Sequence, residues 1–89
     1  MKYKHCVVVW RDITTKSGWA TQEECDTFIM DDKENICYQS GFLYEQDENQ
    51  VVLLNSYFSN QDLLGDITKI PKGCIIKIYE QTNDCKEFS

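Results

Sequence analysis

The chain has 89 residues, of which 42% are hydrophobic and 27% charged, and its formal net charge is −6. This length suits one domain with a modest core, and the composition excludes a disordered chain. The nine basic residues are scattered and include one arginine, which argues against an extended nucleic-acid-binding surface. We expect one domain over residues 1–89, with a frayed tail from about residue 83.

No apolar run approaches the roughly 18 residues of a membrane-spanning helix. The apolar run behind the basic start, residues 6–10, is too short for a signal peptide. We therefore expect no membrane association and a cytoplasmic location. An odd number of cysteines without a Cys-x-x-Cys pair favours reduced, mostly buried thiols over disulfides. The cysteines are Cys6, Cys25, Cys37, Cys74 and Cys85.

The first half of the chain predicts a strand, a turn and a short helix. Residues 5–13 are rich in β-branched and aromatic types, which indicates a strand, and residues 14–18 have the composition of a turn. A capping box with Thr21 as N-cap and Glu24 three residues later precedes apolar residues at helical spacing. We expect a helix over about residues 22–30.

The centre of the chain predicts a β-hairpin. Residues 36–45 alternate apolar side chains at every second position, and residues 50–58 begin with another apolar run. The polar residues 46–49 between them suit a hairpin loop. Gly41 in the first of these strands predicts a bulge or a close backbone approach.

The last third of the chain predicts a loop and two further extended segments. Residues 59–66 have the composition of a loop, with a sharp turn at Gly65. Residues 67–71 read as extended, and residues 74–79 as a last strand. The sum is a mainly β domain with one short helix (α+β), with four or five antiparallel strands. Because so small a sheet needs closure or a cover, we expect an SH3-like or Sm-like partly closed barrel. A sheet with the helix on one face is the alternative.

The chain shows no constellation for catalysis, metal binding or phosphate binding. His5 is the single histidine, and its neighbour Cys6 points to the opposite face of a strand, so the two make a poor base–nucleophile pair. The cysteines lie too far apart for a zinc site, and no phosphate-binding glycine motif occurs. We expect a protein that is not an enzyme and that needs no cofactor or metal.

Candidate ligand-binding residues lie on either side of the first turn. Trp10 reads as a core residue, whereas Trp19 follows Gly18 in a polar loop. Trp19 is either a stacking platform for a flat ligand, with basic neighbours to meet a phosphate, or a plug that closes one end of a barrel. The candidate ligand-binding residues are Arg11, Asp12, Lys16, Ser17 and Trp19.

Five short motifs carry a resemblance to a known group of proteins. They are Val-x-Trp-x-Asp-Ile, Ser-Gly-Trp, Ser-Gly-Phe-Leu, Val-Val-Leu-Leu-x-Ser and Ile-Pro-Lys-x-x-Ile-x-x-Ile, spread from Val8 to Ile78. This pattern resembles a family of small tailed-phage proteins. The resemblance implies a phage origin, a compact β fold and no enzymatic activity, and it transfers no catalytic residue.

By type, the chain is similar to phage anti-defence proteins that sequester a nucleotide immune signal between identical subunits. We therefore expect a non-enzymatic protein that holds a cyclic dinucleotide or a cyclic ADP-ribose-type molecule unchanged. We also expect a homo-oligomer, because a set of apolar residues lies on faces opposite the main core set. These residues are Val7, Val9, Val52, Leu54, Phe58, Ile75 and Tyr79.

Two alternatives for the function stay open. The first is an acidic protein-interaction module that blocks a host protein, with contacts from the acidic loops at residues 31–34 and 45–48. The second is a structural phage protein.

Overall fold

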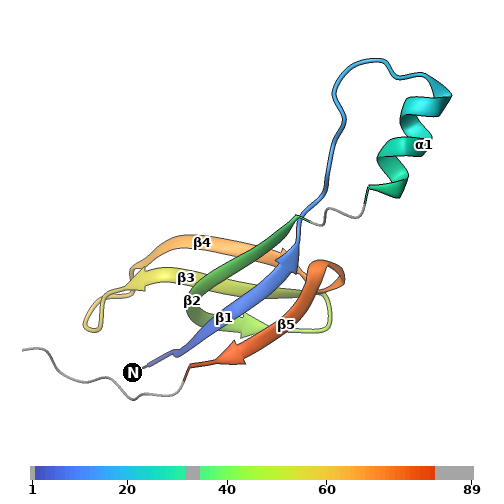
Figure 1. The fold of residues 1–89 in the computed structure, drawn as a ribbon. Helices are drawn as coiled ribbons and strands as arrows, with labels where there is room; N and C mark the ends of the chain where they lie inside the picture. The colour runs from blue at the N-terminus through green and yellow to red at the C-terminus, as the bar shows by residue number, and fades with distance from the viewer. Residues whose placement is uncertain (1, 32–34, 82–89) are drawn as a thin grey trace, which may run out of the picture.

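The computed structural model describes residues 2–31 and 35–81, which form five strands and one α-helix (Figure 1). The elements are β1 (Lys4–Arg11), α1 (Gln22–Met30), β2 (Ile36–Gln46), β3 (Gln50–Tyr57), β4 (Leu64–Pro71), the 3-10 turn η1 (Lys72–Cys74) and β5 (Ile75–Glu80). A mainly β domain with one short helix is therefore confirmed for the described residues. The predicted tail from residue 83 lies outside them.

The strands form one antiparallel sheet in the order β4-β3-β2-β1-β5. β4 and β5 are its two edges, and the sheet does not close into a barrel in the described part of the chain. The sheet curves instead, so that Val8 of β1 packs in one cluster with residues of β3 and β4, although β2 lies between β1 and β3. The helix does not cover the sheet either, so the alternative arrangement is also not observed (Figure 1).

The core lies on the concave side of this bent sheet. A cluster of buried residues, Val8, Val51, Leu53 and Ile70, is flanked by Trp10, Leu43, Ile75 and Ile78. Four consecutive residues of β3, Val51 to Leu54, are buried. Because successive strand residues point to opposite faces, β3 is covered on both sides. Phe42 lies beside Leu54 in the register and helps to cover the second side.

At Gly41, β2 passes close to β3. A Cβ atom at this position would lie 3.0 Å from the backbone oxygen of Leu54 and 3.2 Å from the Cβ of Leu53. The expected close backbone approach is therefore confirmed, and a side chain here would push β2 away from β3. Two residues further on, the pairing of β2 with β3 shifts between Leu43 and Glu45, which marks a bulge.

The hairpin between β2 and β3 is held by Asp47. Its Oδ1 accepts hydrogen bonds from the backbone N–H groups of Asn49 at 2.7 Å and Gln50 at 2.9 Å. These two donors favour the charged carboxylate and lower the pKa of Asp47 from its ordinary value of 3.8. The predicted hairpin is confirmed, with a turn one residue shorter than expected.

The prediction of a sharp turn at Gly65 is wrong. β4 begins at Leu64, and Gly65 pairs with Ser56 of β3. A Cβ at Gly65 would collide with the Ser56 hydroxyl oxygen, so a side chain here would require that hydroxyl to move. The left-handed backbone conformation falls on the next residue, Asp66, at φ 52°. The last strand also starts later than expected, because Cys74 ends the 3-10 turn.

Residues 12–35 leave the sheet as a projecting arm between β1 and β2 (Figure 1). We call this segment the arm; residues 32–34 within it lie outside the described part. The backbone N–H of Asp12 donates to the carbonyl of Asn35 at 2.8 Å and closes the arm at its base. α1 begins where the capping box predicts, since Glu24 N–H donates to Thr21 Oγ1 at 3.1 Å. Within the described residues, no helix has the length and apolar character needed to cross a membrane.

Candidate functional site

The arm presents large apolar side chains to solvent. Trp19 is fully exposed, at 102% of its reference area, and Met30 is 79% exposed. Ile13, Phe28 and Ile29 are also exposed, and no residue of α1 is buried. Exposed apolar groups of this size on one projecting segment make the arm a candidate interaction surface.

The same arm carries most of the negative charge. Residues 12–35 contain seven acidic residues and two lysines, which gives −5 of the chain's −6. Residues 2–11 and 36–81 contain six acidic and six basic residues, so the sheet is neutral overall. The charge is therefore segregated, and α1 has acidic residues in its first turn with no basic residue in its last.

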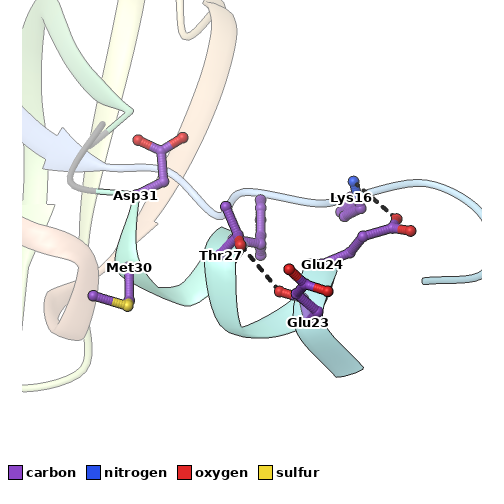
Figure 2. Close-up of a pocket in the computed structure, with 7 residues that line it drawn as sticks. Lys16, Glu23, Glu24, Thr27, Met30 and Asp31 are labelled. Atoms are coloured by element: carbon purple, nitrogen blue, oxygen red, sulfur yellow. Dashed lines mark hydrogen bonds and ion pairs between the residues drawn. The ribbon is translucent and has the colours of Figure 1, made fainter. Parts of the chain in front are cut away.

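An open cleft of about 760 Å³ lies within the arm, between α1 and the segment that leads to it (Figure 2). Lys16 lines it and pairs with Glu24, with 3.9 Å between Nζ and Oε2. The other lining residues are Glu23, Thr27, Phe28, Met30 and Asp31. Three carboxylates against one lysine make this cleft unfavourable for an anion and suitable for a basic or apolar group.

The structure separates the five predicted site residues. Lys16 lines the cleft of the arm, whereas Arg11 and Asp12 line a hollow of about 220 Å³ at its base, beside Trp10 and Lys69. Asp12 Oδ1 also accepts a hydrogen bond from the backbone N–H of Ile13 at 2.8 Å. Ser17 and Trp19 are exposed and line neither cavity. Trp19 therefore plugs no barrel end.

Sequence reasoning missed three features of these surfaces. Lys69 of β4 lines the same hollow as Arg11 at the end of β1, although β3 and β2 lie between these two strands in the sheet order, so no local pattern in the sequence indicates it. The acidic residues of α1 were not assigned to a contact surface, although a count of charge by segment would have found them. The third is a group of aromatic rings around Tyr3 at the far end of the sheet, described below.

His5 and Cys6, the pair considered for catalysis, both pack within the sheet. The His5 ring packs against Phe42, with 5.4 Å between centroids. Cys6 is 3% exposed, and its burial raises the pKa of its thiol; the Glu80 carboxylate raises it further, and Lys4 opposes both. A raised thiol pKa lowers the fraction of nucleophilic thiolate. Among the described residues, no group of three His, Cys, Asp or Glu side chains could hold a metal ion.

Comparison of the chain with protein-family models, with curated proteins and with solved structures finds no match. The phage resemblance, the nucleotide ligand and the non-enzymatic role therefore stay predictions. The class that the fold and the arm define is a small antiparallel β-sheet domain with an apolar, acidic projection.

Proposed function

We propose that the chain is a non-enzymatic protein-binding module whose arm docks onto a basic, apolar-lined surface of another protein. The observation that carries this proposal is the exposure of every residue of α1, together with the full exposure of Trp19. If the chain is phage-encoded, as the resemblance implies, the partner is a host protein in the host cytoplasm.

Helix stability supports the proposal. α1 has nine residues, and isolated helices shorter than about 12–15 residues are marginal in water. No residue of α1 is buried, so the sheet contributes little packing energy to the helix. Burying side chains such as Ile29 and Met30 in a groove contributes about 1.5–3 kcal/mol each. A docked partner would therefore stabilise the helix while it binds.

The charge distribution argues for a foreign basic partner over a second copy. A second copy presents a neutral sheet and another acidic arm, so the arm gains no net electrostatic attraction from it. A basic surface around an apolar groove satisfies the carboxylates and the apolar residues together. Such an interface associates faster at low salt and weakens as salt is added.

The test is capture from bacterial lysate with matched variants. Immobilised wild-type protein should retain one stoichiometric partner that elutes with salt. The apolar variant Trp19→Ala with Ile29→Ser and the charge variant Glu23→Gln with Asp26→Asn should each lose it. Ile67→Ser, which changes a 59% exposed residue on edge strand β4, is the control and should retain it. Retention by all variants, or no stoichiometric partner at low salt, contradicts the proposal.

A second candidate function is sequestration of a small nucleotide signal between identical subunits. What favours it is the hollow at the arm base, which is lined by Trp10 together with the basic residues Arg11 and Lys69. Its volume of about 220 Å³ in one chain is below the roughly 300–1,000 Å³ of typical ligand pockets. A second subunit would have to complete it, and the acidic arms nearby would weaken binding of an anion.

Heat release tests this second candidate. The protein is incubated with cyclic dinucleotides and cyclic ADP-ribose isomers, separated from free ligand and denatured. Intact ligand in the released fraction, lost in Arg11→Gln and Lys69→Gln and kept in Lys16→Gln, supports sequestration at the arm base. Hydrolysed ligand would show an enzyme, and no retained ligand removes this candidate.

A further inference from the structure

A separate pocket lies at the end of the sheet remote from the arm. The arm leaves β1 after Arg11, at the opposite end of this strand from the N-terminus (Figure 1). The pocket is formed around Tyr3, which precedes the first residue of β1. Eight strand residues span about 26 Å, so the two surfaces are distinct. The pocket has a volume of about 320 Å³, and the lining residues that matter here are Lys2, Tyr3, Tyr44, Tyr57, Phe58 and Asp62.

The aromatic rings of this pocket stand at steep angles to one another. Tyr3 and Tyr57 lie at 89° with 4.8 Å between centroids, and Tyr3 and Tyr44 lie at 46° and 5.7 Å. Phe42, which does not line the pocket, also packs against Tyr57, at 87° and 5.0 Å. The rings therefore meet at an angle along one side of the pocket, and two of its lining residues stay open to solvent. Tyr44 is 47% exposed and Phe58 61% exposed.

The electrostatics of the pocket favour a cation. Ring faces carry negative potential and attract an ammonium group within about 6 Å of the centroid. The chain shows this attraction itself, since Lys2 Nζ lies 5.4 Å from the centroid of Tyr3. Asp62 adds a carboxylate to the lining, and the Tyr57 hydroxyl accepts a hydrogen bond from the Lys2 backbone N–H at 3.2 Å.

We propose that this aromatic pocket binds an alkylated ammonium group, either on a small molecule or on a methylated lysine side chain. Methyl groups spread the positive charge over an apolar surface, which suits several ring walls better than a compact, strongly hydrated ammonium. A cluster that only stabilised the sheet would bury its rings, whereas here Phe58 and Tyr44 remain accessible. The inference is independent of the arm, so its failure would leave the proposed docking function untouched.

The direct test is calorimetric titration with choline and with 3,3-dimethylbutanol, its neutral isostere, at constant ionic strength. Choline should bind saturably, and the neutral isostere at least about tenfold more weakly, because that factor corresponds to the 1.4 kcal/mol of a partly desolvated cation–π contact. Equal binding of the two would show a merely apolar pocket. No saturation by about 10 mM choline, against a Kd near 1 mM for a weak site, would overturn the proposal for the small molecule.

A peptide pair distinguishes the two sources of the group. A peptide with trimethyllysine should bind more tightly than the same peptide with unmodified lysine. If choline fails but the trimethylated peptide binds selectively, the source is a modified protein. If neither shows a preference for the alkylated cation, the proposal is wrong.

Variants locate the site. Tyr44→Leu should weaken choline binding about fivefold or more through loss of one ring wall. Asp62→Asn should weaken it and Lys2→Gln should strengthen it, since the second change removes a competing cation. Tyr38→Leu, which changes a 73% exposed tyrosine outside the pocket lining, is the control and should bind as wild type. If Tyr44→Leu fails to fold, Phe58→Leu replaces it. Unchanged binding in all pocket variants would place the ligand elsewhere and overturn the assignment.

Discussion

Two tryptophans nine positions apart occupy opposite environments. Trp10 packs against the core cluster, and its Nε1 donates to Gln39 Oε1 at 3.2 Å, whereas Trp19 is fully exposed. We expect Trp10→Ala to destabilise the fold by about 3 kcal/mol, near the lower end for a large aromatic because the side chain is only partly buried. Trp19→Ala should change stability by less than about 0.5 kcal/mol. Urea denaturation of both variants measures this, and equal midpoints would contradict it.

The cysteines differ in the same way and give a chemical test. Cys25 lies exposed on α1, whereas Cys6 is buried and its pKa is raised. Iodoacetamide should therefore modify Cys25 well before Cys6 in the folded protein, because alkylation needs an accessible thiolate. Mass spectrometry of the timed reaction identifies the order, and the unfolded protein is the control in which the difference disappears. Early modification of Cys6 would show that β1 opens in solution.

At the scale of elements, the β2–β3 turn depends on one carboxylate. Because the pKa of Asp47 is lower in the folded chain than its ordinary value of 3.8, its stabilising effect is complete above that value and is lost as the pH falls through the lowered one. Asp47→Ala should therefore lower the melting temperature at pH 7. The difference from wild type should shrink below pH 3.8 and vanish once Asp47 is protonated. If the difference in melting temperature between the two proteins stays constant down to pH 2, the stabilisation does not come from the charge of Asp47.

Local signals predicted the elements, and long-range contacts decided what local signals could not. The capping box at Thr21 placed α1 correctly, because a cap is read within four residues. Gly65 misled the prediction, because the local sequence does not distinguish a glycine in a turn from a glycine that pairs with Ser56 on the neighbouring strand β3. The position of α1 away from the sheet depends on long-range packing, and the periodicity of the sequence does not indicate it. For the same reason the predicted site residues from Arg11 to Trp19, which are neighbours in sequence, lie on separate surfaces.

At the scale of the whole molecule, self-association stays a prediction, and fewer exposed apolar residues now support it. Val9, Val52 and Leu54, three of the residues on which it rested, are already buried within one chain. Tyr79 remains 45% exposed, and the register places it beside Val7 on one face of the sheet. We expect a homodimer through this face, which leaves the arms free.

Light scattering at micromolar concentration tests this dimer. Wild-type protein should show twice the chain mass of 10.5 kDa, and Tyr79→Ser should shift the population to monomer. Trp19→Ala is the matched control and should keep the dimer. A wild-type monomer would remove the prediction and, with it, any ligand pocket between subunits.

The closed base of the arm has a consequence for how this protein can change over time. β1 and β2 are paired without interruption from Lys4 and Leu43 to Arg11 and Ile36, and the bond between Asp12 and Asn35 completes the ladder. Insertions or deletions beyond that point cannot shift the strand register. Doubling the length of such a loop costs only about 0.6 kcal/mol. The sheet can therefore keep the same structure while mutations change the sequence and length of the arm. The binding specificity of the arm can then change without a change in the fold of the sheet.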